Sequence, residues 1–210
     1  SQEASFKYML LGAFASALFL FGAALLYGYS GSVSLGGIMQ AVRSSAQSGA
    51  NAAFSPLLLM GIMLLLVGLL FKIGAVPFQS WTPDVYQGAP TPVTAFLSVG
   101  SKAAGFVVAG RLFEPFLQAP AIGGICTALL VAVSAATLLL GNLAAIPQSN
   151  FKRLLAYSSI SHAGFLVLAL AAGRTGELGS PQVIAFYMAA YLCMTLLCFA
   201  VLVIVGRSSG

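Results

Sequence analysis

Charged side chains are scarce in this sequence. Only 6% of its 210 residues are Asp, Glu, Lys or Arg, whereas 60% are hydrophobic and the mean hydropathy is +1.00. A soluble domain carries about 25% charged residues, so this composition excludes one of this size. The net charge is +5, but the basic residues are dispersed, and no basic run is longer than the pair Lys152–Arg153. A nucleic-acid partner is therefore not indicated.

Residue types that bind metals or perform catalysis are also few. The chain has one histidine, four acidic residues and three cysteines, Cys126, Cys193 and Cys198, without metal-ligand spacing. We interpret the cysteines as small buried hydrophobic residues. No phosphate-binding loop, dinucleotide fingerprint or nucleophile elbow is visible. We therefore expect no metal site in this chain.

Long apolar segments dominate what is present. Twenty helical residues at about 1.5 Å each match the ~30 Å hydrocarbon core of a bilayer. The sequence predicts an all-α, multi-pass bundle in the lipid bilayer, with six spans at 8–27, about 54–75, 93–113, 122–146, 151–172 and 183–205. A Gly/Ser-rich loop, 28–53, separates the first two spans, and its 32–42 portion is compatible with a short interfacial helix.

The second span is expected to be discontinuous. Pro77 and Pro83 follow its apolar run, and proline both removes a backbone donor and clashes with the preceding turn. We predict a break here, with a freed carbonyl near Lys72, and a short half-helix before the third span. Broken backbone at membrane depth must be satisfied by protein or by a wet cavity.

Three ionisable side chains lie near the middle of different spans: Lys72, Lys102 and His162. Such residues are costly in hydrocarbon and indicate function by default. Histidine titrates near neutrality, and a buried lysine changes its charge state with its surroundings. We expect a lateral proton relay bridged by water, helped by the hydroxyl side chains among residues 157–161.

Structural roles compete with this interpretation. His162 could bond a neighbouring carbonyl, and each lysine could pair with a carboxylate or a carbonyl. Lys7 lies four residues after Glu3, so an interfacial ion pair or snorkelling explains it as well as a relay does. Asp84 follows Pro83 and is expected to cap a turn rather than transfer protons.

The basic residues separate into two sets if the spans alternate in direction. These are Lys7, Lys152, Arg153 and Arg207 at one end, and Arg43, Arg111 and Arg174 at the other. The positive-inside rule places the first end in the cytoplasm. Arg111, Arg174, Glu177 and Arg207 are expected to be interface anchors.

Two long stretches carry a family resemblance. FKIGAVPFQSWTPDVYQGAPTPVTAFLSVGSKAAGF (71–106) and GNLAAIPQSNFKRLLAYSSISHAGF (141–165) resemble subunit N of the proton-translocating NADH:quinone oxidoreductase, respiratory complex I, as does the start of the chain. WTPDVYQGAPTPV is specific to the N-type subunit and its photosynthetic counterpart. The other motifs recur among antiporter-like subunits and related cation/proton antiporters.

The resemblance implies a fold of about fourteen helices with inverted repeats, each containing a discontinuous helix. Residues 1–113 would hold the last three helices of the first repeat, and 114–210 the first three of the second. The chain begins without Met, which suggests a piece of a longer polypeptide. The acidic partner of the central lysine would lie on a helix before this chain, and the second broken helix after it.

Individual site residues also follow from the resemblance. Lys72 corresponds to the central lysine beside the first broken helix, and Lys102 to the lysine that connects two half-channels. Lys7 matches a lysine at the start of the preceding helix, and His162 a histidine of the second repeat. The family usually has His where Gln79 stands and Ser at position 74, so a relay role at position 79 is not expected.

The implied function is proton translocation by a non-redox membrane subunit, coupled to quinone reduction elsewhere in the complex. NADH, FMN, iron–sulfur clusters and quinone are expected in other subunits, and no cofactor is expected in this chain. Its partners would be other membrane subunits of complex I, in a bacterial inner membrane. Two alternatives remain open: a subunit of a sodium/proton antiporter, and a scaffold subunit that does not pump.

Overall fold

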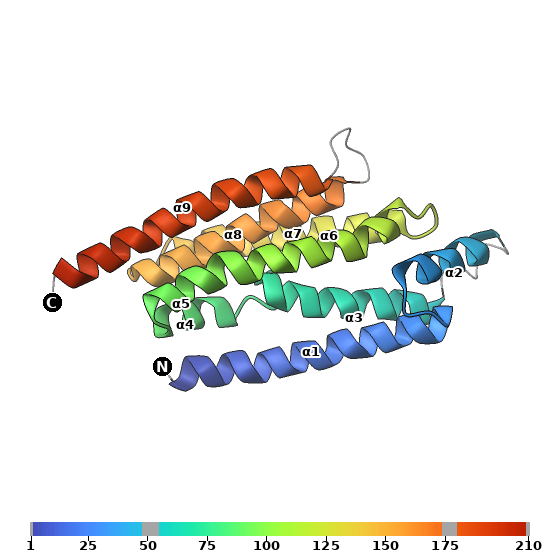
Figure 1. Ribbon diagram of the computed structural model, residues 1–210, viewed down its shortest axis with the longest axis horizontal. Coiled ribbons are helices and arrows are strands. Elements are labelled where there is room, and N and C mark those ends of the chain that lie inside the picture. The colour runs from blue at the N-terminus through green and yellow to red at the C-terminus, as the bar shows by residue number, and fades with distance from the viewer. Residues whose placement is uncertain (1, 48–54, 174–179, 209–210) are drawn as a thin grey trace.

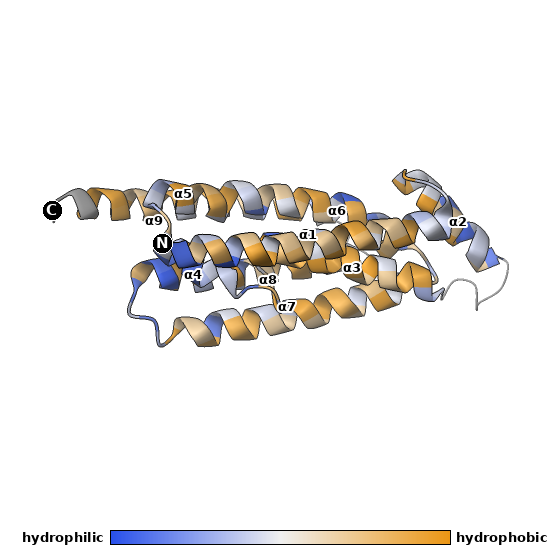
Figure 2. Ribbon diagram, turned by 90° about the horizontal axis from the view of Figure 1, so that it is seen from below, coloured by the Kyte–Doolittle hydropathy of each residue, from blue (hydrophilic) through white to orange (hydrophobic). Residues whose placement is uncertain are grey.

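Long helices lie side by side along one axis in the computed structural model, which describes residues 2–47, 55–173 and 180–208 (Figure 1). Within these residues every regular element is a helix. Six segments are long and apolar enough to cross a membrane, at 2–30, 56–73, 91–118, 123–145, 151–172 and 181–205. Figure 2 shows how apolar residues dominate these helices. The predicted all-α bundle of six spans is confirmed.

The long helices are α1 (Gln2–Ser30), α3 (Pro56–Ile73), α6 (Lys102–Gln118), α7 (Gly123–Ala145), α8 (Phe151–Ala172) and α9 (Ser180–Ser208). The shorter elements are α2 (Leu35–Gln47), α4 (Trp81–Gly88), α5 (Thr91–Phe96) and the π-helical turn η1 (Leu97–Ser101). The segments α5, η1 and α6 run on without a gap, so the third span is longer than the predicted 93–113. Pro115 lies inside α6 and does not end it.

The short helix α2 confirms that the first loop contains a helix, and its place at the membrane interface stays a prediction. Its Ile38, Met39 and Val42 are buried, whereas Arg43 on the same helix is exposed. This one-sided burial is typical of an amphipathic helix at a membrane surface.

The break after α3 is confirmed, and several of its backbone groups form hydrogen bonds within the protein. Gly74 ends α3 in the left-handed region, at φ +70°, where a residue without a Cβ is favoured. The Ala75 amide donates to the Leu70 carbonyl at 2.9 Å. The indole Nε1 of Trp81 donates to the Phe71 carbonyl at 3.0 Å, so the carbonyl predicted to be free near Lys72 has a partner.

The predicted half-helix is α4, which begins after residues 74–80. Pro77 lies in this irregular stretch, and its peptide bond with Val76 is cis. Pro83 does not interrupt a helix but lies in the first turn of α4, where a missing amide hydrogen leaves no bond unmade.

The helix directions place the basic residues as predicted. The start of α1, the half-helix α4 and the turn between α7 and α8 lie at one end of the bundle (Figure 1), which brings Lys7, Lys152 and Arg153 together. Arg43 on α2 and Arg111 near the end of α6 lie towards the other end. Arg174, Glu177 and the side chain of Arg207 fall outside the described residues, as does the predicted start of the second span at Phe54. Which end faces the cytoplasm stays a prediction.

One expectation about the cysteines is wrong. Cys126 is buried, but Cys193 is exposed and Cys198 only partly covered. The apolar helix α9 packs against its neighbours on one side only, so an apolar sequence there does not imply burial within this chain.

Candidate functional site

Lys102 is buried in the bundle at the first position of α6, directly after η1. Its side chain is 3% exposed, and its Nζ donates to both the carbonyl oxygen and the hydroxyl of Ser159 on α8, each at 2.5 Å. An amino group at membrane depth needs acceptors of this kind. Lys102 also follows a π-helical turn, a distortion that is frequent at functional sites.

The hydroxyl of Ser159 is the centre of a small polar cluster. It accepts a hydrogen bond from the Tyr191 hydroxyl on α9 at 2.8 Å and lies 3.2 Å from the Tyr86 hydroxyl on α4. Ser159, Tyr86 and Tyr191 are each at most 3% exposed. Four elements, α4, α6, α8 and α9, therefore converge on one buried serine.

His162 lies one turn after Ser159 on α8 and belongs to the same cluster. Its Nδ1 is 2.6 Å from the Tyr187 hydroxyl of α9, rather than bonded to a carbonyl. The ring of Tyr191 is near both basic groups, 5.1 Å from the His162 ring and 5.8 Å from Lys102 Nζ. A cavity of about 110 Å³, lined in part by Ser159, His162 and Tyr191, is large enough for water.

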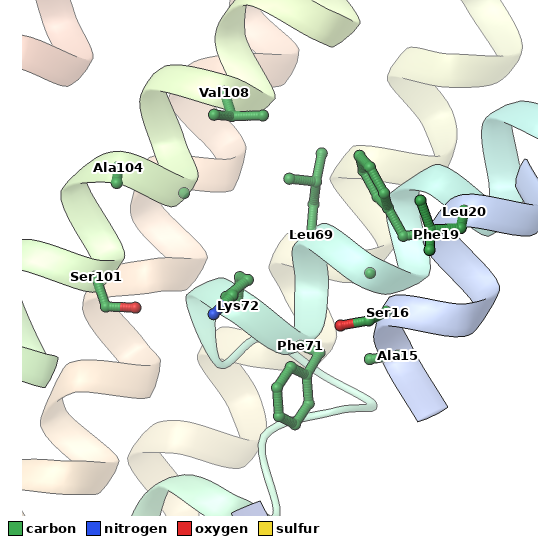
Figure 3. Close-up of a pocket in the computed structure, with 12 residues that line it drawn as sticks. Ala15, Ser16, Phe19, Leu20, Leu69, Phe71, Lys72, Ser101, Ala104 and Val108 are labelled. Atoms are coloured by element: carbon green, nitrogen blue, oxygen red, sulfur yellow. The ribbon is translucent and has the colours of Figure 1, made fainter. Parts of the chain in front are cut away.

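Lys72 lies in a separate groove. It is exposed near the end of α3, in a cavity of about 470 Å³ between α1, α3 and α6. Figure 3 shows its amino group facing Ser101 of η1. The Lys102 side chain, in contrast, reaches from α6 to Ser159 of α8. The Lys72 amino group forms no hydrogen bond or ion pair with any of the described residues.

Lys7 takes part in an ion cluster at the end of the bundle. Its Nζ lies 2.6 Å from a Glu3 oxygen and 2.8 Å from Asp84 Oδ2, and Arg153 Nη1 contacts Asp84 Oδ1 at 3.0 Å. The predicted pair with Glu3 is confirmed. The expectation that Asp84 caps a turn is wrong, because its two oxygens bind cations from α1 and α8.

This cluster determines the charge state of Asp84, which lies on α4 outside the six spans. The hydrogen bond from Lys7 is the largest influence and lowers the pKa of the carboxyl below its ordinary value. Partial burial works in the opposite direction, and the hydrogen bond from Arg153 adds to the lowering. Asp84 is therefore a firmly ionised carboxylate in this structure.

Two buried oxygens at the helix break lack partners. Gln79 Oε1 and Thr82 Oγ1 accept no hydrogen bond from any described residue. Gln79 carries an amide, which does not titrate as a histidine would. Within the described part of the chain, no three metal-ligating side chains lie together.

The structure thus brings Lys102 and His162 together but leaves Lys72 and Lys7 in surroundings of their own. The sequence did not indicate Tyr86, Tyr187 and Tyr191 as members of the cluster. A signal for the last two exists, because tyrosines four residues apart in an apolar helix lie on one face. For Tyr86 the sequence contains no comparable signal.

Comparison with known proteins places these features in a family. The sequence model described as "NADH:quinone oxidoreductase/Mrp antiporter, TM" matches residues 1–209. NADH-quinone oxidoreductase subunit N of Dehalococcoides mccartyi is 46% identical over 213 residues, which cover 100% of this chain and 44% of the relative. The subunit N of Rhodococcus opacus is 47% identical over 210 residues, covering 100% and 37%.

A solved structure shares the fold at similar identity. A chain of respiratory complex I from Thermus thermophilus, solved with bound aureothin, superposes with a TM-score of 0.75 at 44% identity, covering 95% of this chain and 40% of that one. The present chain spans less than half the length of these relatives. It is an integral multi-pass membrane protein that belongs to the NADH:quinone oxidoreductase/Mrp antiporter family.

Proposed function

We propose that the full-length protein is a proton-translocating membrane subunit of an NADH:quinone oxidoreductase, and that this chain carries part of the proton path. The observation that supports it most is Lys102, a buried amino group that donates to Ser159, which in turn lines a cavity of about 110 Å³ together with His162. Similarity to subunit N supports the identity of the complex.

In this mechanism Lys102 cycles between an ammonium and a neutral amine. Its surroundings supply neutral acceptors rather than a fixed counter-charge, so the ammonium form is only moderately favoured. A change of charge elsewhere in the membrane arm would then release its proton. The hydroxyl cluster, His162 and water in the adjoining cavity would carry the proton onward. Lys72 would be a station on the other side of α6, and Lys7 would take part at the end of the bundle only when its ion pairs with Glu3 and Asp84 open.

Redox chemistry would take place in other subunits, which would bind NADH, FMN, the iron–sulfur clusters and quinone. This chain would contact neighbouring membrane subunits of the complex in a bacterial inner membrane. Residues 1–113 and 114–210 would contribute three helices each to two inverted repeats, a division supported by the motif resemblance.

The proposal is tested by replacing Lys102 with Met in the full-length subunit of the assembled complex, since Met preserves the length of the side chain and removes its charge. We expect NADH oxidation by an artificial acceptor to continue and quinone-coupled proton pumping to fall at least several-fold. Lys102→Arg should fall as well, because a guanidinium does not release its proton. Pumping at the wild-type proton-to-electron ratio in Lys102→Met would contradict the relay.

A sodium/proton antiporter is the second candidate, because the matching family includes the Mrp antiporters. Sodium-driven proton movement by the reconstituted full-length protein, without NADH-linked electron transfer, would favour it. A pure scaffold would instead be indicated by normal assembly and pumping in a Lys72→Ala/Lys102→Ala double variant.

A further inference from the structure

The hydroxyl of Ser159 has three polar neighbours but only one proton. A serine hydroxyl offers one donor and two acceptor lone pairs. Lys102 Nζ, Tyr191 Oη and Tyr86 Oη all lie within hydrogen-bond distance of it. Three contacts therefore match its full capacity, provided that two neighbours donate and one accepts.

The geometry assigns these roles unequally. At the Tyr191 contact the tyrosine is the donor, whereas at the Tyr86 contact either hydroxyl can donate. An ammonium at Lys102 also donates. In this state Lys102 and Tyr191 occupy both lone pairs of Ser159, and the serine proton must go to Tyr86.

A neutral amine at Lys102 changes the assignment without moving any heavy atom. The amine nitrogen then has a lone pair, so Ser159 can donate its proton to Lys102 while accepting from Tyr191 and Tyr86. One remaining amine N–H still reaches the Ser159 carbonyl. Every contact is made in both charge states, which matters because an unmade hydrogen bond is costly in a buried site.

We propose that Ser159 is a positioning residue whose hydroxyl turns between Tyr86 and Lys102 as Lys102 loses and regains its proton. The proposal rests on the proposed function only in that Lys102 cycles between charge states. Tyr86 reverses from acceptor to donor in the same step, whereas Tyr191 donates throughout. Lys102 can thus titrate in place, with no rearrangement of α6 or α8.

Other titratable groups near Lys102 do not replace this device. The ring of His162 on α8 lies 5.1 Å from the Tyr191 ring, and its Nδ1 is within hydrogen-bond distance of the Tyr187 hydroxyl of α9. Lys72 of α3 lies on another side of α6, beside Ser101 and Gly105. No carboxylate among the described residues lies within ion-pair distance of the Lys102 amino group.

Two matched variants separate the device from simple packing. When Lys102 is an ammonium, Tyr86→Phe leaves the Ser159 proton without an acceptor. When Lys102 is a neutral amine, the same change removes only one donor to Ser159. Tyr86→Phe therefore favours the neutral amine of Lys102. Tyr191→Phe removes one donor from both states equally. Each change deletes a single buried hydroxyl that contacts Ser159, and each retains its aromatic ring.

The readout is competitive labelling of amines by acetic anhydride as a function of pH, because only neutral amines react. Lys102 is quantified by mass spectrometry in the full-length protein within its complex, with Lys152 as the internal reference for an intact fold. We expect the labelling midpoint of Lys102 to fall by about one pH unit in Tyr86→Phe and to stay within about 0.3 units in Tyr191→Phe.

A second pair of variants keeps the test valid if Tyr86→Phe does not assemble. Ser159→Ala removes an acceptor from the ammonium and should lower the midpoint, whereas Ser159→Thr retains the hydroxyl and should restore it. Ser161→Ala is the matched control, since that hydroxyl on the same helix bonds Asn142 instead. Equal shifts in Tyr86→Phe and Tyr191→Phe, or an unchanged midpoint in Ser159→Ala, would overturn the proposal.

Proton pumping measured in parallel distinguishes failure of the turning Ser159 hydroxyl from failure of the proposed proton relay. If the labelling midpoints shift as predicted but Lys102→Met pumps normally, the turning hydroxyl is supported and the relay function is contradicted. Loss of pumping in Lys102→Met with unshifted midpoints in Tyr86→Phe and Ser159→Ala would do the reverse.

Discussion

Two lysines of this chain are stabilised as cations in opposite ways. Lys7 lies between two carboxylates, Glu3 and Asp84, whereas Lys102 donates only to the carbonyl oxygen and the hydroxyl of Ser159. A fixed counter-charge favours retention of a proton, and neutral acceptors permit its release. At the scale of single residues, the ion cluster around Asp84 is therefore suited to fastening helices, and the Ser159 cluster to proton exchange.

Replacing Asp84 with Asn should test the fastening role. Because the folded-state pKa of Asp84 is lowered, its ion pairs contribute stability above the ordinary aspartate pKa, and this contribution is lost as the pH falls through the lowered pKa. We expect Asp84→Asn to lower the free energy of unfolding by about 1 kcal/mol at pH 7, since partly exposed pairs are individually weak. Unfolding of the full-length protein by SDS in detergent micelles at pH 7 and pH 3 measures the difference.

Glu114→Gln is the matched control, because Glu114 contacts only Gln118 among the hydrogen bonds of the described residues, at 3.5 Å. It should change stability little at either pH. A deficit of Asp84→Asn that stays the same size at pH 3 would show that charge is not the cause.

The sequence identified these basic residues and the Glu3 partner of Lys7, but not the partners that come from distant helices. A charge inside an apolar run stands out because it is costly there, so Lys72, Lys102 and His162 were found without a structure. Asp84 lies 77 positions from Lys7, and Ser159 lies 57 positions from Lys102. Contacts over such separations depend on how helices pack, which a single sequence does not specify.

At the scale of helices, α7 holds α8 in the place that the Ser159 cluster requires. Gly141 of α7 lies so close to α8 that a Cβ there would come within 2.8 Å of the Ser161 amide nitrogen. The Ser134 hydroxyl of α7 also donates to the Gly164 carbonyl of α8 at 2.7 Å. Small residues allow this approach between membrane helices.

We expect Gly141→Ala to destabilise the protein by about 1–3 kcal/mol, because the added methyl group meets backbone that cannot turn away. Gly110→Ala is the matched control, since a Cβ at Gly110 of α6 has no atom within 4 Å in this structure. That change should be neutral or slightly stabilising, as alanine is the better helix former. Equal unfolding midpoints for the two variants in detergent would refute the close α7–α8 contact.

Sequence patterns predicted some helical features and not others. The break at residues 74–80 was predictable, because Pro77 lacks a backbone donor and clashes with the preceding helical turn. The π-helical turn η1 was not, since LSVGS contains no residue that forbids regular helix. Its position before Lys102 depends on the packing of neighbouring helices, as does the continuation of α6 past Pro115.

For the whole molecule, the groove at Lys72 is the feature of this chain that most needs a further partner. Residues 1–210 span less than half the length of their relatives, so further helices of the family fold are expected around them. The groove at Lys72 is lined mainly by apolar side chains of α1, α3 and α6. A lysine in such surroundings is stable in a membrane only with a partner or with water.

We therefore expect a carboxylate from outside these 210 residues to lie within 4 Å of Lys72 Nζ in the full-length protein. A structure of the complete subunit in its membrane complex checks this directly. An acidic partner would also make Lys72→Met more damaging than removal of both charges together, because Lys72→Met alone leaves a buried carboxylate unpaired. Lys72→Met and the double variant that also neutralises the carboxylate, compared by assembly and by unfolding in detergent, measure that difference.

A groove filled only by lipid or apolar side chains would mean that Lys72 has no fixed counter-charge. The path between Lys72 and Lys102 would then have to run through water alone.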